Sequence, residues 1–480
     1  MKTVVFINPP MTLEARYGAL ARAGAMEPPF GLCHLAAVTR EQGYETRIID
    51  AEALGLSVDE TAREALSHKP DYIGLTATTP AIVSAARVAE KIKLAAPEIP
   101  VIVGGCHVTA IPEATLAEFS SFDIAAVGEG EVTILELLHC LGMGMSLERV
   151  LGLAFRREGT IILTPPRPLI KDLDTLPIPA FDLLPRLDRH YGVTVQSADR
   201  FPAVSLITSR GCYAKCTFCD TSVTGSTMRG HGAAYVARLM KLVQQRYGIR
   251  CVMFEDDNFL AFRKRLKELE AHIKRDHVDM TWSCTSRVDI AHRETLERAK
   301  RLGCWQVSYG VESGSQKILD FYNKRITVAQ SERALEMSRD AGLLTKGFVI
   351  LGGPLETMET LEETRSFVMR AALDDISITY FVPYPGAAVW GVCEQYGAFD
   401  RDWEKLTCFE VVFIPHGLSR AVLEKRQREI FREFYCRPRV LAGYLRRIKT
   451  RHHLVDLVGS GLALARHILL APSPLSYRIR

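Results

Sequence analysis

Short apolar runs alternate with amphipathic stretches over the first 145 residues of the chain. The runs are rich in β-branched residues and end at turn residues, which predicts strands. These strands lie at Val4–Ile7, Glu45–Ile49, Tyr72–Leu75, Val101–Val103 and Ile124–Val127. Helical patterns fill the intervals near 31–42, 58–68, 81–95, 112–119 and 131–142. Strands separated by crossover helices predict an α/β fold with a parallel, doubly wound sheet.

Turn residues cluster at the carboxyl ends of these strands, in residues 8–10, 76–80, 104–109 and 128–131. Ligands of doubly wound sheets bind at those ends. The pair Gly104-Gly105 would let the backbone approach a large planar ligand closely. An ordinary flavodoxin-like domain with tight turns would show the same pattern, so both interpretations stay open.

A proline-rich stretch without clear periodicity follows in residues 146–200, which favours an ordered connector. Within it, Leu151–Phe155 and Thr160–Leu163 predict a hairpin around Glu158-Gly159.

A second series of strands and helices begins near residue 201. The strands are expected at Ala203–Ile207, Cys251–Phe254, Thr281–Thr285, Gln306–Tyr309, Lys346–Leu351 and Asp375–Phe381. The helices are expected near 233–246, 262–275, 292–302, 327–341 and 358–372. Six strands that each end in a polar or glycine-rich loop predict an open, partial (β/α)6 barrel with function on those loops.

The C-terminal region from residue 401 reads as helical, with a charged helix at Ser419–Tyr435. Residues 437–480 carry nine Lys or Arg against one acid. Leu454–Leu470 is apolar but marginally short for a membrane span. The tail could be an amphipathic helix on an anionic membrane surface, or a basic helix docked on its own protein.

Composition narrows the choices further. The 480 residues are 47% hydrophobic and 24% charged, as in soluble globular proteins. A net charge of +4 is too small to indicate nucleic acid binding. The start of the chain does not resemble a signal peptide, and 12 scattered cysteines favour free thiols in a reducing cytoplasm.

Cys212, Cys216 and Cys219 lie in one short stretch directly after the first strand of the second series. Three soft thiolates can hold three corners of a cubane iron–sulfur cluster and leave the fourth iron open. An open metal position characterises catalytic rather than structural metal sites. Inert buried thiols or a zinc site completed by His231 are the alternatives.

The spacing of these cysteines, with Phe218 before the last one, resembles the cluster loop of radical S-adenosylmethionine (SAM) enzymes. The resemblance implies a [4Fe-4S] cluster bound by Cys212, Cys216 and Cys219, whose open iron binds SAM. It also implies SAM contacts from the loops after the later strands. The expected SAM-binding residues are Phe218, Glu255, Asp256, Asp257, Arg287, Glu312, Gly352 and Gly353.

By this resemblance, the acidic segment after the second strand binds the SAM ammonium, and Arg287 pairs with the SAM carboxylate. Glu312 accepts hydrogen bonds from the ribose, and Gly352-Gly353 lines the adenine side. Glu312 in a structural salt bridge, and Arg287 as an ordinary strand-end residue, remain open alternatives.

The sequence Gly104-Gly-Cys-His-Val-Thr109 and the later Val127-Gly-Glu-Gly-Glu131 resemble the cobalamin-binding domain fused to one branch of radical SAM enzymes. The Asp-x-His-x-x-Gly motif, whose histidine ligates cobalt in mutases, is absent. The resemblance therefore implies base-off cobalamin without histidine ligation, so His107 is expected near the cofactor but not on the cobalt. The expected cobalamin-binding residues are Asn8, Thr76, Thr78, Gly104, Gly105, His107, Gly128 and Glu129.

The resemblance covers residues 1 to about 400 and gives a domain plan. We expect a Rossmann-like cobalamin-binding domain in 1–145, a linker in 146–200, a radical SAM partial barrel in 201–400 and a helical region in 401–480. The implied function is reductive cleavage of SAM to a 5′-deoxyadenosyl radical, followed by methyl transfer to an unactivated carbon or phosphorus of a small-molecule or lipid-like substrate.

Two other functions fit the same residues. Some relatives in this branch are oxidative cyclases of the anaerobic magnesium-protoporphyrin ester cyclase type, or catalyse ring rearrangements. A non-catalytic corrinoid or iron–sulfur carrier would bind the cofactors without cleaving SAM. The expected partners are a small, hydrophobic substrate and a reductant such as flavodoxin or ferredoxin, with no nucleic acid and with peripheral membrane contact through the tail.

Overall fold

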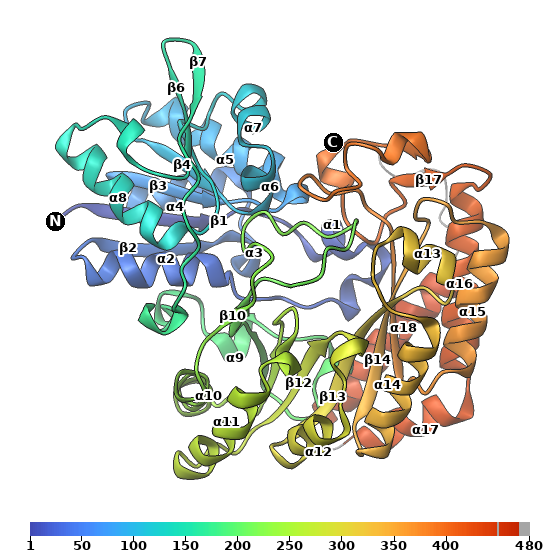
Figure 1. Ribbon diagram of the computed structural model, residues 1–480. Coiled ribbons are helices and arrows are strands. Elements are labelled where there is room, and N and C mark those ends of the chain that lie inside the picture. Colours follow the sequence, from blue (N-terminus) through green and yellow to red (C-terminus); the bar gives the residue numbers. More distant parts are fainter. Residues whose placement is uncertain (449–450, 470–480) are drawn as a thin grey trace.

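The computed structural model describes residues 1–448 and 451–469 and is built around two largely parallel sheets (Figure 1). The first sheet has the order β2-β1-β3-β4-β5-β6-β7, and its first five strands are parallel. They are β1 (Thr3–Asn8), β2 (Glu45–Asp50), β3 (Tyr72–Thr76), β4 (Val101–Gly104) and β5 (Ile124–Ala126). The predicted doubly wound sheet is therefore confirmed.

Helices cover both faces of this sheet because its strands are apolar on both sides. Phe6 and Ile102 pack in one cluster with residues of α2 (Phe30–Glu41) and α8 (Gly130–Met143). The alternate residues Val5 and Val103 pack in a second cluster beneath α4 and α5. The remaining helices of this half are α1 (Leu13–Tyr17), α3 (Ala51–Leu54), α4 (Val58–Ser67), α5 (Ile82–Ala95), α6 (Cys106–Ala110) and α7 (Pro112–Glu118).

The hairpin expected in the connector forms, but it extends the first sheet instead of standing apart. β6 (Leu153–Arg157) pairs antiparallel with β5 and with β7 (Thr160–Leu163). Figure 1 shows this hairpin projecting from the top of the molecule. The sheet thus continues past residue 145, where we placed the end of the domain. The rest of the connector runs through short helical turns and α9 (Leu187–His190).

The second sheet has the order β15-β14-β13-β12-β11-β8, with every neighbouring pair parallel. Its strands are β8 (Ala203–Leu206), β11 (Cys251–Phe254), β12 (Thr281–Ser286), β13 (Cys304–Glu312), β14 (Leu344–Leu351) and β15 (Asp375–Tyr380). Because β8 and β15 are both edge strands, the barrel is open on one side. This is the partial barrel expected from the sequence.

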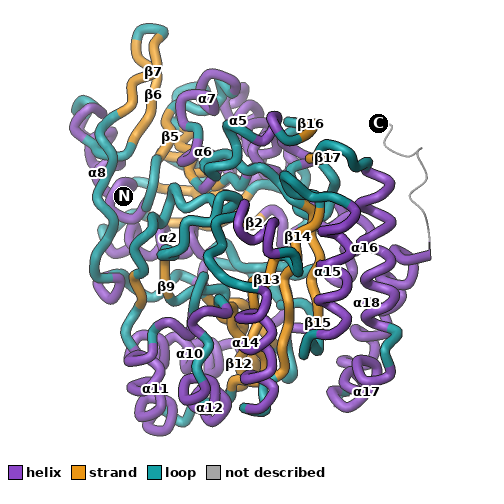
Figure 2. The backbone as a smooth tube through the Cα atoms, turned by 45° about the vertical axis from the view of Figure 1, so that its right-hand side comes forward, coloured by secondary structure: helices purple, strands orange, loops and turns teal. Residues whose placement is uncertain are grey.

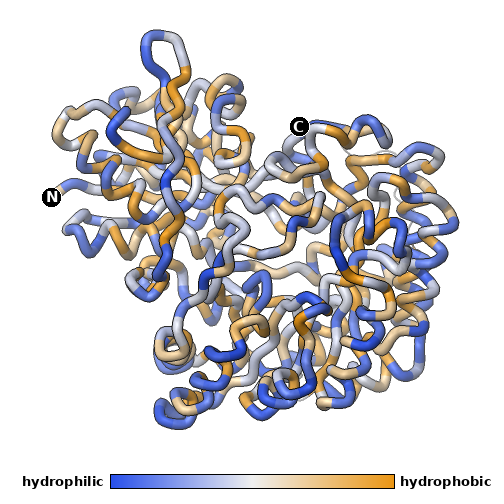
Figure 3. The backbone as a smooth tube through the Cα atoms, viewed as in Figure 1, coloured by the Kyte–Doolittle hydropathy of each residue, from blue (hydrophilic) through white to orange (hydrophobic). Residues whose placement is uncertain are grey.

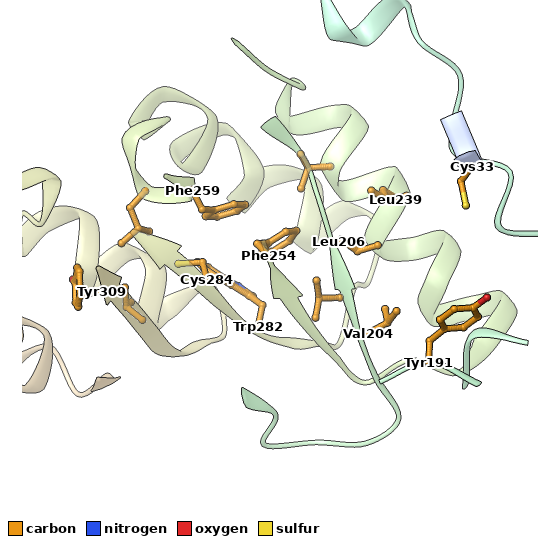
Figure 4. Packing of buried hydrophobic residues seen from close by; sticks show 14 of the residues in the cluster. Cys33, Tyr191, Val204, Leu206, Leu239, Phe254, Phe259, Trp282, Cys284 and Tyr309 are labelled. Atoms are coloured by element: carbon orange, nitrogen blue, oxygen red, sulfur yellow. The ribbon is translucent and has the colours of Figure 1, made fainter. Parts of the chain in front are cut away.

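Helices after successive strands cover the convex face of the half-barrel. They are α10 (Ala233–Tyr247), α11 (Arg263–Arg275), α12 (Arg293–Arg301), α13 (Gln316–Phe321), α14 (Val328–Asp340) and α15 (Met358–Arg370). Figure 4 shows the core between them, where Leu206, Phe254 and Trp282 from adjacent strands pack with Phe259 and with Leu239 of α10. This packing fixes the strand ends that carry the site.

Three helices follow the barrel: α16 (Arg420–Tyr435), α17 (Pro438–Arg447) and α18 (Arg451–Leu469). Figure 2 shows α18 beside α16, and His467 Nε2 lies 3.0 Å from Gln427 Oε1. One face of α18 is therefore docked on the protein. Figure 3 shows that apolar and polar segments alternate along these helices. Within the described residues, no helix is both long and apolar enough to span a bilayer.

Candidate functional site

The cysteine loop leaves the half-barrel at the carboxyl end of β8, as expected. A two-stranded ribbon of β9 (Ser209–Arg210) and β10 (Arg229–Gly230) frames it. Burial raises the pKa of Cys216, which is the buried thiol of the three, and the nearby Lys324 ammonium partly offsets this rise. The thiols also influence one another, so they share one electrostatic environment.

Donors and cations surround these thiols. Asn258 Nδ2 lies 3.1 Å from Cys212 Sγ, and Arg287 Nη1 lies 3.7 Å from Cys216 Sγ. Such groups stabilise thiolates and the negative charge of a thiolate-bound cluster. Among the described residues, no three cysteine, histidine or acidic side chains already form a closed metal-binding group. Ligation by the individual cysteines therefore stays a prediction, supported by the donors around them.

The three consecutive carboxylates after β11 separate into different environments. Glu255 and Asp257 line a cavity between the two sheets. Burial raises the pKa of Asp257, and burial together with the charge of Glu27 raises the pKa of Glu255 to about 8. Asp256 is fully buried.

The carboxylate of Asp256 is already occupied. It accepts hydrogen bonds from the backbone N–H of Thr208 at 2.6 Å, from Ser209 Oγ at 2.7 Å and from Arg265 Nη2 at 3.2 Å. We therefore reassign Asp256 from SAM contact to support of the segment that leads into the cysteine loop. A strand alternates its side chains between two faces, so neighbouring carboxylates cannot all point into one cavity.

Glu312 and Arg287 both lie beside the cysteine loop but are held by protein partners. Glu312 has a positive φ of 58°, and its Oε1 accepts from Lys324 Nζ at 2.5 Å. Arg287 donates to Asp289 at 2.9 Å and to the Lys324 carbonyl at 2.7 Å. The structural salt bridge that we left open for Glu312 is thus present, and its ribose contact remains a proposal.

The glycine pair after β14 forms a tight turn over an aromatic ring. The N–H groups of Gly352 and Gly353 both donate to the buried carboxyl of Glu356. A side chain at Gly353 would collide with the Tyr322 hydroxyl. The Tyr322 ring in turn packs edge-on against Phe218 at 4.9 Å. Phe218 and Gly353 are therefore part of one packed wall next to the cysteine loop.

A cavity of about 360 Å³ opens at the carboxyl ends of the first sheet and faces the half-barrel. Five of the residues expected to bind cobalamin line it: Thr76, Gly104, Gly105, Gly128 and Glu129. It continues between the sheet and helices α2 and α8, past Phe6, Gly74 and Ile134. A Cβ at Gly105 would lie 2.6 Å from the Ala77 carbonyl, so only glycine allows this approach.

Three expected cobalamin residues do not line this cavity. The side chain of Asn8 is bound to Asp50 at 2.8 Å, and Thr78 is exposed. His107 is buried, with its ring 4.8 Å from the Trp403 ring and its Nδ1 3.4 Å from Thr79 Oγ1. The structure therefore places these three residues outside the cavity, and their cobalamin contacts stay predictions. His107 follows a lining glycine, but the first turn of α6 points its ring away from the cavity.

Sequence reasoning missed several residues at the site. His34 on α2 lines the cavity, its Nδ1 has no hydrogen-bond partner, and burial lowers its pKa to about 3. A neutral ring with an unpaired polar atom suits a polar group of a bound ligand. Asn258 and Lys324 beside the thiols were also missed. Asn258 follows the acidic run, but nothing local to Lys324 indicated its role.

A buried ionic cluster joins the two sides of the cavity. Arg210, two residues before Cys212, pairs with Glu129 at 2.8 Å and with Glu131 at 2.5 Å. Arg229 pairs with Glu129 at 2.9 Å. Glu129 and Glu131 belong to the loop and first turn of α8, next to Gly128. The glycine-rich end of the first sheet is therefore tied directly to the segment that carries the cysteines.

Comparison with known proteins agrees with this two-part site. A B12-binding domain matches residues 18–138, and the radical SAM superfamily matches residues 206–368. An uncharacterized methyltransferase of Pyrococcus horikoshii is 35% identical over 424 residues, which cover 87% of this chain and 90% of that protein. The chain belongs to the B12-binding radical SAM enzymes.

Other relatives fit this family. The anaerobic magnesium-protoporphyrin IX monomethyl ester cyclase of Rubrivivax gelatinosus is 29% identical over 441 residues, covering 90% of this chain and 77% of the cyclase. The structure of OxsB, a cobalamin-dependent SAM radical enzyme with aqua-cobalamin bound, superposes with a TM-score of 0.73 at 15% identity. That match covers 96% of this chain and 72% of OxsB, and it shows a common fold.

The cofactors of this B12-binding radical SAM enzyme are SAM, a [4Fe-4S] cluster and cobalamin. The residues present fit them. The cysteine loop supplies three thiols with donors around them. The glycine-lined cavity supplies close backbone approach, an apolar interior and the unpaired Nδ1 of His34.

Proposed function

We propose that the protein transfers a methyl group to an unactivated carbon or phosphorus of a small, largely apolar substrate. The observation that carries this proposal is the shared cavity. The glycine-rich ends of β4 and β5 line it from one side. Glu255, Asp257 and the segment Ser209–Gly211, which leads into the cysteine loop, line it from the other, whereas the three cysteines themselves are not among its lining residues. Cofactors held at these two faces would meet across one substrate position, which radical methyl transfer requires.

When bound, the cluster supplies the electron that cleaves SAM to a 5′-deoxyadenosyl radical, and cobalamin supplies the methyl group. The protein orients these groups and excludes water. We assign ligation of the cluster to Cys212, Cys216 and Cys219. Asn258 and Arg287 hold donors toward two of these sulfurs, and Glu255, whose pKa is raised by burial, faces the cavity.

The test is anaerobic reconstitution with iron and sulfide, followed by SAM and dithionite. We expect 5′-deoxyadenosine from the wild type and none from Cys216→Ala. Cys436→Ala is the control, because Cys436 is an exposed thiol that is not part of the cysteine loop. A non-catalytic carrier would bind iron and cobalt without producing deoxyadenosine. That outcome would overturn the proposal.

A second candidate function is oxidative cyclisation, favoured by the relative from Rubrivivax gelatinosus. SAM carrying a trideuterated methyl group separates the two. A transferase moves the deuterated methyl group into its product, whereas a cyclase leaves it in methionine. Flavodoxin or ferredoxin is the reductant class that we propose for either reaction.

Contact with an anionic membrane surface through the tail is a further part of the proposal. Val455, Leu462 and Leu469 of α18 are 65%, 54% and 79% exposed, and Arg446 and Arg447 precede this helix. Such a face suits an interfacial helix. Sedimentation with phosphatidylserine vesicles tests this contact. Leu462→Glu should abolish cosedimentation, and equal vesicle binding by the wild type and the variant would contradict membrane contact through the tail.

A further inference from the structure

A second and larger cavity, of about 680 Å³, lies away from the one described above. Its walls are the edge strand β15, the short helical turn Gly18–Ala23 and helices α16, α17 and α18. Most of its lining is apolar, including Phe431, Leu457 and Ile468. This volume falls within the range of about 300–1,000 Å³ typical of small-molecule sites.

The rim of this cavity is apolar and open to solvent. Leu441 and Leu445 of α17 are 51% and 68% exposed, and Leu454 and Val458 of α18 are 43% and 51% exposed. All four also line the cavity. Large apolar residues gathered around an opening are unusual on a folded protein and indicate a contact with an apolar partner.

The inner end of the cavity holds a buried ion pair and buried oxygen atoms that lack hydrogen-bond partners. Asp375 Oδ1 accepts hydrogen bonds from Tyr435 at 2.7 Å and Tyr444 at 2.8 Å, whereas its buried Oδ2 has no hydrogen-bond partner. Lys346 Nζ lies 3.6 Å from that oxygen. Ser460 Oγ is also buried without a partner. Buried polar atoms of this kind normally bind water or a ligand.

Lys346 links this polar end to the cofactor cavity. It is on β14, opposite Asp375 in the register with β15. Leu344, two residues before Lys346, packs with Met253, two residues before Glu255, inside the half-barrel. Because side chains alternate along a strand, Lys346 and Glu255 face the same interior, and Glu255 also lines the cavity between the two sheets. A molecule seated in the apolar cavity would therefore point its inner end toward the cofactors.

We propose that this second cavity holds the body of the substrate, an elongated and mainly hydrocarbon molecule whose leading end carries a hydrogen-bonding group near Asp375 and Lys346. The assignment rests on the proposed function for the reaction at that leading end. The occupant is a small apolar molecule and not a peptide, because the deepest polar atoms are few and the walls offer hydrocarbon contact.

Two glycines of α18 provide a matched test with diphenylhexatriene, an elongated apolar fluorescent probe. Gly461 lines the cavity and Gly459 does not, and a Cβ at either position meets no atom within 4 Å. Both substitutions by leucine raise helix propensity equally. We expect saturable probe binding to the full-length wild type, binding at least about tenfold weaker in Gly461→Leu, and unchanged binding in Gly459→Leu.

Val458→Glu is a second variant, because this residue is exposed at the rim and a charge there leaves the fold intact. It should also weaken probe binding. Absence of saturable binding, or equal affinity in all four proteins, would overturn the inference. The probe binds without any cofactor. If the probe does not bind but the enzyme still forms deoxyadenosine, only the assignment of the second cavity to the substrate is contradicted. If the probe binds but SAM is not cleaved, only the proposed reaction is contradicted.

Discussion

Gly353 has no room for a side chain, because its Cβ would fall against the Tyr322 hydroxyl. We predict that Gly353→Ala lowers the free energy of unfolding by about 1–3 kcal/mol through overpacking. Adding Tyr322→Phe should restore part of the loss. Gly391→Ala is the control, since a Cβ there meets nothing within 4 Å. Chemical denaturation measures all four proteins, and equal stability of Gly353→Ala and Gly391→Ala would contradict the packing described here.

Glu312 combines a positive φ with a buried charge partner, Lys324. Glu312→Gln leaves that ammonium without its counter-charge beside the thiols. We predict a loss of about 3–5 kcal/mol in stability and SAM binding weakened by at least about tenfold if the ribose contact is made. Equilibrium binding of SAM to the reconstituted protein measures the second effect. Lower stability with unchanged SAM affinity would leave Glu312 as a purely structural residue.

Individual residues differ in how well sequence predicts them. Cys212, Cys216 and Cys219 lie in one short segment, so the sequence alone could indicate a cluster-binding loop. The sequence did not show which carboxylates of the run Glu255-Asp256-Asp257 would face the cavity. The three residues are chemically alike, and only the folded backbone places Asp256 in the core. The direction of the His107 side chain could not be predicted either, because a position two residues after Gly105 does not determine where a side chain points.

The turn after β14 depends on protonation of one carboxyl. Burial raises the pKa of Glu356 from its usual 4.5 to about 8. A native-state pKa above the unfolded value means that this group stabilises the fold fully below pH 4.5 and loses that contribution as the pH rises to about 8. The slope is at most about 1.4 kcal/mol per pH unit.

We therefore predict that Glu356→Gln flattens the decline in unfolding free energy between pH 5 and pH 8, because a glutamine oxygen still accepts from Gly352 and Gly353 but does not ionise. Glu359→Gln, on the exposed side of the same helix start, is the control. Denaturant titrations at each pH measure the slope. Parallel pH profiles for the Glu356→Gln variant and the wild type would contradict a proton on Glu356.

At the scale of elements, hydrophobic periodicity located the strands and main helices within a few residues of their bounds. Those elements follow local rules of burial and turn chemistry. The β6–β7 hairpin was expected as a hairpin, yet its attachment to β5 was not. Pairing between sequence-distant strands depends on tertiary contacts, which local pattern does not encode.

At the site, the two halves of the molecule are connected by ion pairs between Arg210 and the carboxylates of Glu129 and Glu131 at the start of α8. We predict that Glu131→Gln costs about 3–5 kcal/mol, because it leaves a buried guanidinium partly uncompensated. Glu136→Gln is the matched control on the same helix, where the 45% exposed side chain pairs with Arg167 and should cost about 1 kcal/mol or less. Cobalt retained after gel filtration gives a second readout, which only Glu131→Gln should lower. Equal effects of the two substitutions on stability and on cobalt retention would contradict an ionic connection between the two halves of the molecule.

The sequence could not predict this ion pair, because Glu131 and Arg210 are 79 residues apart and each resembles an ordinary surface charge. The same holds for the second cavity, whose walls come from both ends of the chain. The family resemblance supplied the order of the two halves, but only the folded chain brings residues 18–23 against α18.

The central claim is that one chain holds both the cluster and cobalamin at a common cavity. The most direct measurement is iron and cobalt analysis of the anaerobically reconstituted protein together with its ultraviolet–visible spectrum. The account predicts iron and cobalt in a ratio of about four to one, with iron lost from a Cys212→Ala, Cys216→Ala, Cys219→Ala triple variant. A colourless protein that contains stoichiometric zinc, or iron without cobalt, would contradict it.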